Sequence, residues 1–462
     1  MIKYIFRRFT SCRLKYPNSI KLCAPCNFLS SSSILHVKRK YPILPEKAED
    51  LPVFQYPVAD PTDKRIYVWG LAEHGALGNH VQNRKSKVIK RHFFLPVRLQ
   101  FGELHKVVDF TCGYGFTAFA VQSKGTHKVF GCGINTDSQI GYHAVKRNHP
   151  LSIILNPLPI DIPFVSPNTI RIKQVAAGRA HLLVLTETEG VYLLGNNAYG
   201  QCGRKIVESE DYSGHPIINN ITHLEGDKIN KIECGQDHSL FITETGKVYT
   251  CGWGADGQTG SGHYGNSYHP SQVKGDIEGE IITKVACSVD CVLALNNKGE
   301  IFGWGNSEYG QLVSPEEKVQ LNAAVYLEKC RSLGKIVDIA AGGSFCMAVN
   351  EEGALFVWGF GILGKGPKVD HSLEPTNIPS TLFGQNEFEP HSKVVGIEAG
   401  IGHMAATTNS GNLYMWGHNR SGCLGLGHMD DQFFPLRVSI GASVQKVRCG
   451  VDHTVALCQP FV

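Results

Sequence analysis

Each of the five tryptophans in this chain of 462 residues is followed directly by glycine. The Trp-Gly phrases begin at Val68, Gly252, Gly303, Val357 and Met415, and two degenerate copies carry Cys132 and Leu194 in place of tryptophan. The glycines after the tryptophan position are Gly70, Gly133, Gly195, Gly254, Gly305, Gly359 and Gly417, spaced by 63, 62, 59, 51, 54 and 58 residues. Such a period is typical of repeat architectures, so we expect seven similar units.

A second phrase alternates with the Trp-Gly phrase. IKQVAAGRAHLLVL, INKIECGQDHSLFIT and VQKVRCGVDHTVAL are three of its seven copies. Apolar residues alternate with small or polar ones around a central turn, which predicts two short strands. Glycine tolerates the positive φ of such a turn, and aspartate caps the neighbouring N–H groups. Together the two phrases supply about four antiparallel strands per unit, the content of one propeller blade.

The two ends of the repeat region each hold half a unit. The chain enters on a Trp-Gly half, Ile66 to Gly78, and leaves on a strand pair, Val444 to Leu457. Joining the halves completes a blade and removes two exposed sheet edges. We therefore expect an all-β fold, a seven-bladed β-propeller over residues 65–462, with its last blade closed by the N- and C-terminal halves. Loss of the last ~15 residues should unfold it.

The first 45 residues differ in charge from the rest of the chain. They hold nine of the 45 basic residues and no acidic one, and Ile2, Ile5, Phe6 and Phe9 share one helical face. These are marks of a mitochondrial transit peptide, so we assign residues 1–45 to a leader and 46–64 to a linker. Without the leader, 36 basic residues face 41 acidic ones, a net charge of −5. The alternative is a disordered tail in which Lys38, Arg39 and Lys40 serve nuclear import.

The alternation of CGxxH and WGxNxxGQLG phrases resembles the seven-bladed regulator of chromosome condensation family, over about 390 residues of this chain. Phrases such as NNAYGQCGRK, GWGNSEYGQL and VWGFGILGKGP are most similar to the mitochondrial branch of that family. The resemblance implies a protein of the mitochondrial matrix. It also implies two roles: nucleotide exchange on the dynamin-like GTPase of inner-membrane fusion, and membership of the module of proteins and RNA, with a pseudouridine synthase, that supports large-subunit ribosomal RNA and mitoribosome biogenesis.

Composition and motifs favour binding over catalysis. No apolar run approaches the ~18 residues of a spanning helix, so only peripheral membrane association is compatible with the sequence. Fifteen scattered cysteines favour reduced thiols, because an odd number cannot all pair. No metal, cofactor or catalytic constellation is predicted. The segment Ser314 to Lys335 is expected to form a helical insertion, with Val319, Ala323, Val325 and Tyr326 as its apolar stripe.

A histidine recurs at one place in the second phrase. His181, His238, His403 and His453 occupy it in four units, and Phe116, Cys291 and Phe345 occupy it in the others. A metal site would not accept phenylalanine, so this pattern favours a packing position with a structural hydrogen bond.

Function is expected in the turns and loops at the rims of the ring, where residues vary between units. In the family that this chain resembles, acidic and histidine residues of the turns line the face that grips a small GTPase. The matching residues are Asp237, His238, His403, Asp452 and His453. The alternative is that these side chains only cap their turns.

One loop, residues 80–100, is strongly basic and lacks acids. Cations that neutralise phosphates beside aromatics that stack on bases are what RNA binding requires. The candidate RNA contacts are Arg84, Lys85, Lys87, Lys90, Arg91, Phe93 and Phe94. A solvated linker is the alternative. Other functions left open are nuclear or cytosolic exchange on a small GTPase and, more distantly, hydrolysis in a propeller pocket.

Overall fold

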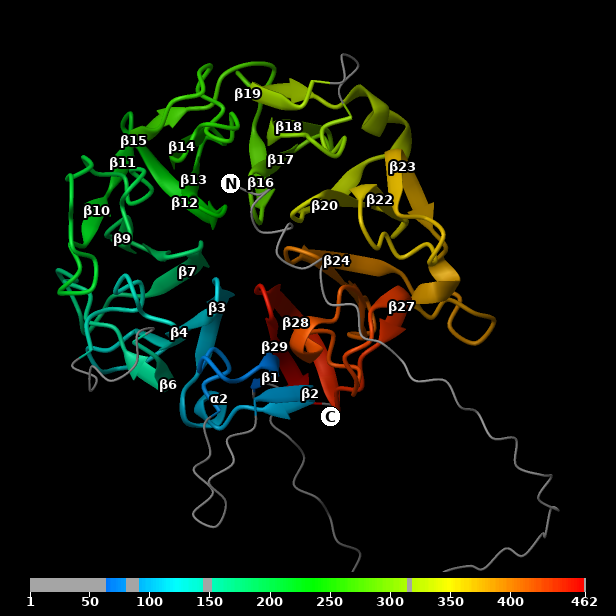
Figure 1. The fold of residues 1–462 in the computed structure, drawn as a ribbon, viewed down its shortest axis with the longest axis horizontal. Coiled ribbons are helices and arrows are strands. Elements are labelled where there is room, and N and C mark those ends of the chain that lie inside the picture. The colour runs from blue at the N-terminus through cyan, green and yellow to red at the C-terminus, as the bar shows by residue number, and fades with distance from the viewer. Residues whose placement is uncertain (1–63, 80–90, 144–151, 314–317, 461–462) are drawn as a thin grey trace, which may run out of the picture. The chain divides into compact units, whose positions relative to one another are not determined.

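The computed structural model describes residues 64–79, 91–143, 152–313 and 318–460. Seven antiparallel sheets stand side by side in a ring around a central opening (Figure 1). The predicted all-β, seven-bladed propeller is confirmed. The leader, residues 1–45, the first eighteen positions of the linker (46–63) and the loop cations Arg84, Lys85, Lys87 and Lys90 lie outside the described residues.

The first three blades follow one another along the chain. Blade 1 consists of β3 (Val107–Cys112), β4 (Phe116–Val121), β5 (Val129–Gly133) and β6 (Ile154–Pro159). Blade 2 consists of β7 (Ile172–Ala177), β8 (His181–Thr186), β9 (Val191–Gly195) and β10 (Asn219–Ile221). Blade 3 has five strands, β11 (His223–Leu224), β12 (Asp227–Cys234), β13 (His238–Thr243), β14 (Val248–Gly252) and β15 (Ser267–Gln272).

Three further blades repeat this order. Blade 4 consists of β16 (Ile282–Cys287), β17 (Cys291–Asn296), β18 (Ile301–Asn306) and β19 (Gln320–Tyr326). Blade 5 consists of β20 (Ile336–Ala341), β21 (Phe345–Asn350), β22 (Leu355–Phe360) and β23 (His371–Ile378). Blade 6 consists of β24 (Val394–Ala399), β25 (His403–Thr408), β26 (Leu413–Gly417) and β27 (Gln432–Arg437). The short helices are α2 (Phe101–Leu104), η2 (Glu328–Leu333), η3 (Ser380–Phe383) and η4 (Arg420–Gly422).

Blade 7 is built from both ends of the chain. Its strand order is β2–β1–β29–β28, with β1 (Arg65–Leu71) and β2 (His92–Arg98) from one end and β28 (Ala442–Cys449) and β29 (His453–Pro460) from the other. The two halves meet where β1 pairs with β29, from Arg65 opposite Cys458 to Gly70 opposite His453. Backbone hydrogen bonds therefore close the ring, as the half units at the two ends predicted.

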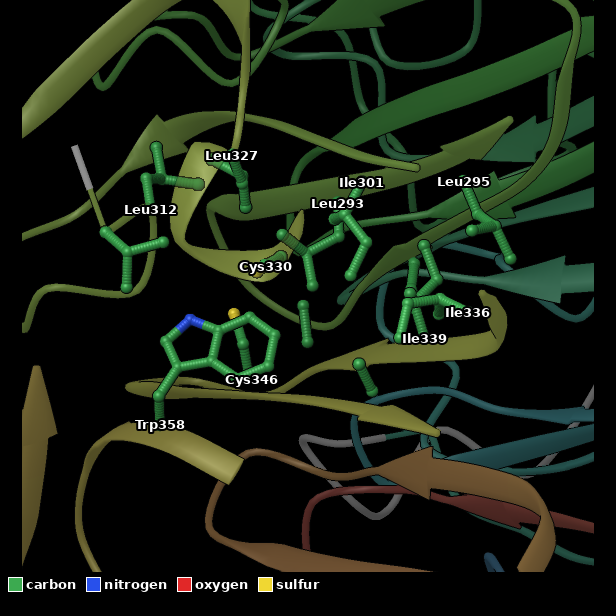
Figure 2. Close-up of a cluster of buried hydrophobic side chains, with 14 of the residues drawn as sticks. Leu293, Leu295, Ile301, Leu312, Leu327, Cys330, Ile336, Ile339, Cys346 and Trp358 are labelled. Atoms are coloured by element: carbon green, nitrogen blue, oxygen red, sulfur yellow. The ribbon is translucent and has the colours of Figure 1, made fainter. Parts of the chain in front are cut away.

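The hydrophobic core lies between blades, because each sheet packs on a neighbour with both faces. The second strand of a blade is consequently buried at every position in β4, β8, β13, β17 and β21. Figure 2 shows the cluster between blades 4 and 5, where Leu293 and Leu312 of one blade meet Ile339 and Trp358 of the next.

Three tryptophans tie each blade to the one before it. The indole N–H of Trp304 donates to the Gln258 carbonyl at 3.0 Å, that of Trp358 to Gln311 at 2.7 Å and that of Trp69 to Cys423 at 2.7 Å. All three rings are fully buried. A buried indole N–H needs an acceptor, so the tryptophan fixes the loop that supplies the carbonyl.

Trp253 does not occupy the strand position that the other four tryptophans share, one residue before the marker glycine, and this corrects the alignment of the repeats. In blade 3 the marker glycine is Gly252, opposite His238, whereas the sequence reading took Gly254. A Cβ at Gly252, where φ is +119°, would lie 2.5 Å from the Asp237 carbonyl oxygen, so only glycine fits. Cys251 fills the tryptophan position, and the spacings around this blade become 57 and 53 residues. Trp253 is displaced toward the surface and is half-buried.

Polar side chains of the innermost strands link neighbouring blades around the central opening. Each lies at a bulge, where the strand register shifts. Asp109 accepts a hydrogen bond from the Val175 N–H at 2.9 Å, and Gln174 accepts one from the Ile232 N–H at 3.0 Å. Farther around, Asp338 accepts from Ile397 at 2.9 Å. These contacts satisfy backbone groups that a bulge leaves unpaired.

An ion triad crosses the axis itself. Arg448 of β28 pairs with Glu398 of β24 at 2.9 Å and with Glu233 of β12 at 3.2 Å. The three side chains are only 16–18% exposed and border a cavity of about 40 Å³. The C-terminal half of blade 7 is thus connected to blades 3 and 6, on two sides of the ring.

The prediction of a helical insertion from Ser314 to Lys335 is wrong for residues 318–335, the part that the structure describes. This part forms strand β19 and the short 3₁₀ helix η2. β19 pairs with β18, for example Val325 with Gly303, and completes blade 4 as its outer strand. The unpaired edge of β18 decides this conformation, because tertiary pairing overrides a local helical pattern.

Candidate protein-interaction face

The order of strands in each blade gives the ring two distinct faces. If strands are counted outward from the innermost one, which is β12 in blade 3, the turn between the first and second strands and the loop between the third and fourth lie at one end, because the strands alternate in direction. We call this end the turn face. The turn between the second and third strands and the connections between blades lie at the opposite face. The predicted contacts Asp237 and Asp452 both belong to the turn face.

The histidines of the repeated position are buried beneath the turn face. His181 and His238 are fully buried, and His403 and His453 are 1% exposed. Burial lowers their imidazole pKa, to about 3 for His181 and His238 and to about 4 for His403 and His453, so these rings are neutral at pH 7. Of the five predicted GTPase contacts, the three histidines therefore lie inside the blades.

The hydrogen bonds show what these histidines do. Thr117 donates its hydroxyl proton to the Ala76 carbonyl at 2.7 Å and lies 3.0 Å from His453 Nε2. The hydroxyl has a single proton, so His453 must carry its own on Nε2 and donate it to Thr117. His181 meets Ser239 in the same way at 3.1 Å, while Ser239 donates to Gln201. In these two positions the imidazole thus joins one blade to the next, as the packing interpretation expected.

The aspartates have different surroundings. Asp237 forms a two-point ion pair with Arg179, with Nη2–Oδ2 at 2.8 Å and Nε–Oδ1 at 3.1 Å. The Asp237 side chain is 10% exposed and that of Arg179 is 43% exposed, so the guanidinium forms the surface above the carboxylate. Burial raises the pKa of Asp452. Its main-chain carbonyl accepts from the Leu71 N–H at 2.8 Å and joins the two halves of blade 7.

A third acid, Asp290, stands at the same turn position in blade 4. Gln258 donates to its carboxylate at 2.9 Å. Burial, followed by the negative charges of Asp256 and Asp237, raises its pKa to about 7. The charge of its carboxyl therefore changes near neutral pH. Nearby, burial raises the pKa of Tyr114, which donates to the Ser288 carbonyl at 3.4 Å.

Aromatic side chains that the sequence reading missed flank these charges. Trp253 packs edge-on against Tyr199, with ring centroids 4.6 Å apart. Tyr309 stacks on Phe360, which is 44% exposed, at 5.4 Å. The main-chain N–H of Trp253 donates to the main-chain carbonyl of Asp237 at 2.9 Å, so the backbone of Trp253 lies against the turn that carries Asp237. The sequence signal for Trp253 was the extra Gly-Trp-Gly step after Cys251.

The described RNA candidates, Arg91, Phe93 and Phe94, lie at the start of β2. The side chain of Arg91 is 70% exposed and lies 3.7 Å from Glu73. Phe93 packs against the core between blades 7 and 1, which leaves its ring less free to stack. Phe94 is 37% exposed and stacks on His92 with centroids 5.8 Å apart. Of the described candidates, one cation and one aromatic ring are therefore exposed at this edge of blade 7.

Other kinds of site find little support in the described residues. They contain no group of three or more His, Cys, Asp or Glu side chains placed to hold a metal. No helix among them is long and apolar enough to cross a membrane. A groove of about 510 Å³ in blades 1 and 2 has His127 and Asp161 as its titratable lining residues, 3.7 Å apart. The two side chains are 54% and 90% exposed, and neither Ser nor Cys lines the groove beside them.

Comparison with known proteins agrees with this geometry. The family model described as "Regulator of chromosome condensation (RCC1) repeat" matches residues 63–120, 189–242, 245–295, 298–349 and 410–457. The "RCC1-like G exchanging factor-like protein" of Mus musculus is 44% identical over 428 residues, covering 90% of this chain and 92% of the relative. The crystal structure of human WBSCR16 matches 86% of this chain and all of its own, at 43% identity and a TM-score of 0.80.

A more distant structure, yeast RCC1 (Prp20) bound to Kap60, has a TM-score of 0.72 at 18% identity and covers 97% of both chains. At that identity the likeness concerns the fold alone. The repeats, the half blades that close the ring and the relatives at over 40% identity lead to one conclusion. This chain belongs to the regulator of chromosome condensation repeat family.

Proposed function

We propose that this propeller is a guanine-nucleotide exchange factor that binds its GTPase through the turn face, with Arg179, Asp237 and Trp253 at the centre of the contact. The observation that carries the proposal is this cluster: a tryptophan and an arginine, the residue types that dominate binding energy at interfaces, are both bonded to Asp237, Arg179 through its side chain and Trp253 through its main chain. A relative at 44% identity bears the name "G exchanging factor-like", which supports the same activity.

Exchange requires binding and no nucleophile. A factor that binds the nucleotide-free GTPase more tightly than the GDP-bound form lowers the affinity for GDP by the same factor, because the two binding events are linked. The Arg179 guanidinium is positioned by two bonds to Asp237 before any partner arrives. Such pre-organisation reduces the entropy lost on association.

The partner that we propose is the dynamin-like GTPase of mitochondrial inner-membrane fusion, in the matrix compartment. The proposal is supported by the acid-free, amphipathic leader and by the resemblance to the mitochondrial branch of the family. Peripheral association of the propeller with the inner membrane would bring the two proteins together.

The test is release of fluorescent GDP from the purified GTPase, with the propeller added at increasing concentration. We expect wild-type protein to accelerate release. We expect Arg179→Ala, Asp237→Ala and Trp253→Ala each to reduce the acceleration by about tenfold or more, the effect of losing a central interface residue.

Asp161→Ala is the matched control. Asp161 is 90% exposed and lies in a connection between blades, at the opposite face. The control should retain full activity, and all variants should keep the wild-type circular dichroism spectrum. The absence of acceleration by the wild type, or full activity of all three turn-face variants, would rule out this face as the exchange site.

A second candidate role is RNA binding in the module for large-subunit ribosomal RNA. The exposed Arg91 and Phe94 on the same segment favour it, since cations and accessible rings are what single-stranded RNA contacts. Crosslinking of RNA in intact mitochondria, with wild type and a variant neutralised at Arg84, Lys85, Lys87, Lys90 and Arg91, tests this role. Enrichment of large-subunit ribosomal RNA that falls in the variant supports it, and recovery at background excludes it.

A further inference from the structure

The innermost strands carry an asymmetric ring of exposed side chains near the opposite face. Each of these strands begins at that face, because the connection from the preceding blade enters there. Their flanks are covered by the next strand of the same blade and by the neighbouring blades. Exposed side chains at their beginnings therefore reach solvent at the end of the ring axis, around which the innermost strands are arranged in Figure 1. We call this region the axial mouth.

One side of the axial mouth is cationic. Lys173 of β7 and Lys231 of β12 are both exposed. Lys173 donates to the Asn230 amide oxygen at 2.5 Å and Lys231 to the Thr283 carbonyl at 2.6 Å. Both bonds go to neutral acceptors, and neither ammonium group has a carboxylate partner within the described part of the chain. Their charges remain available to a ligand.

Lysines on two other innermost strands, β16 and β28, are already neutralised. Lys284 forms an ion pair with Asp338, and Lys446 forms one with Asp109. Burial and the neighbouring charges of Lys284 and Lys173 lower the pKa of Lys231, in that order of importance. The cations of blades 2 and 3 therefore repel one another, and an anion placed among them would relieve that repulsion.

The other side of the axial mouth is apolar. On that side, Val337 of β20 and Val395 of β24 are 46% and 47% exposed. Val108 of β3 is 36% exposed and lies in blade 1, beside the cationic blade 2. All three valines stand at the same repeat position as Lys173, one residue after the buried residue that opens the strand. A ligand that fills the mouth would meet ammonium groups on one side and methyl groups on the other.

We propose that the axial mouth binds a segment of a partner protein in which acidic side chains alternate with apolar ones. The carboxylates would pair with Lys173 and Lys231, and the apolar side chains would cover Val337 and Val395. An extended peptide presents successive side chains to opposite sides, which matches a mouth that is charged on one side and apolar on the other. A nucleic acid would satisfy the lysines and leave the valines uncovered.

The test is selection of a random twelve-residue peptide phage library on the full-length protein, followed by fluorescence anisotropy with the selected peptides. We expect enrichment of sequences with Asp or Glu next to Val, Leu or Ile. Their Kd should rise at least tenfold for the double variant Lys173→Glu, Lys231→Glu and should also rise with salt. If the double variant does not fold, Lys231→Met replaces it in the test, because methionine removes the charge without introducing one of opposite sign.

Two controls make the outcome specific. Lys124→Glu reverses an exposed lysine in the turn between β4 and β5, also at the opposite face, and should leave the Kd unchanged. Asp237→Ala should also leave it unchanged, so failure here is distinct from failure of the proposed exchange activity. The proposal is overturned if no acidic, apolar motif is enriched or if binding survives the lysine variants. Tighter binding of single-stranded RNA to the same lysines overturns it in favour of a nucleic-acid site.

Discussion

At the scale of single residues, position within the repeat decides whether a tryptophan is structural or exposed. Trp304 follows a strand glycine and donates into the loop of the preceding blade. Trp253 comes two positions later in its own unit, at the place that Asn306 occupies in blade 4. The main-chain N–H of Trp253 donates to the Asp237 carbonyl and that of Asn306 to the Asp290 carbonyl, both at 2.9 Å. The same side chain therefore serves the core in one blade and the turn face in another.

This difference predicts opposite effects of two alanine substitutions. Trp304→Ala removes a fully buried ring and its hydrogen bond and should destabilise the fold by about 3–5 kcal/mol. Trp253→Ala should cost less than about 1 kcal/mol while impairing exchange. Urea unfolding followed by circular dichroism measures both. Equal losses of stability would show that Trp253 is a core residue and would remove it from the proposed contact.

At the scale of elements, each strand depends on a partner that the local sequence does not reveal. The residues of β19 read as a helix because apolar side chains recur at helical spacing, yet Leu321 and Ala324 are the ones buried. Their pairing with β18 gives blade 4 its outer strand. Strand β29 has partners on both sides, β1 and β28, which come from opposite ends of the chain.

Removal of β29 should therefore unfold the whole propeller. Deletion of residues 448–462 separates β1 from β28 and takes Val455 and Leu457 out of the core between blades 7 and 1. We expect no cooperative thermal transition by circular dichroism, since two exposed sheet edges and an open core remain. Deletion of residues 461–462 alone is the control and should melt like the wild type. A cooperative transition near the wild-type Tm in the long deletion would contradict the role assigned to this strand.

At the scale of the whole molecule, the ring is held by contacts repeated from blade to blade, and these contacts respond together to pH. Four buried histidines, in blades 2, 3, 6 and 7, share one position, and burial lowers the pKa of all four to about 3 or 4. Unfolding exposes them to water, where the ordinary histidine pKa is about 6.5. As pH falls below 6.5, the unfolded state takes up protons that the native state does not.

Stability should accordingly be greatest above pH 6.5 and decline as pH falls toward 4. His453→Phe gives blade 7 the phenylalanine that blades 1 and 5 carry at this position, and it removes one of the four buried imidazoles. The slope of its unfolding free energy against pH should be smaller than that of the wild type, by up to about 1.4 kcal/mol per pH unit. Urea unfolding at several values between pH 5 and 7.5 gives the slopes. Identical slopes in the two proteins would show that His453 does not titrate on unfolding.

The candidate site divides between what could and could not be read from the sequence. The resemblance supplied Asp237, and the repeat placed it in a turn. Arg179 was not predicted, because its ion pair with Asp237 joins turns of two blades that lie 58 residues apart. The sequence indicated the burial of His238, His403 and His453 in one way only: phenylalanine replaces histidine at the same position of other units.

The sequence by itself determined the number of blades, their strand order and the closure of the ring, because each depends on periodic patterns of glycine, tryptophan and apolar residues along the chain. Tertiary structure alone decided which tryptophan is free, which segment completes blade 4 and which charges meet. Those outcomes depend on contacts that form only when the chain has folded: a carbonyl 2.5 Å from the Cβ position of Gly252, an unpaired strand edge, and two carboxylates brought to Arg448 across the axis.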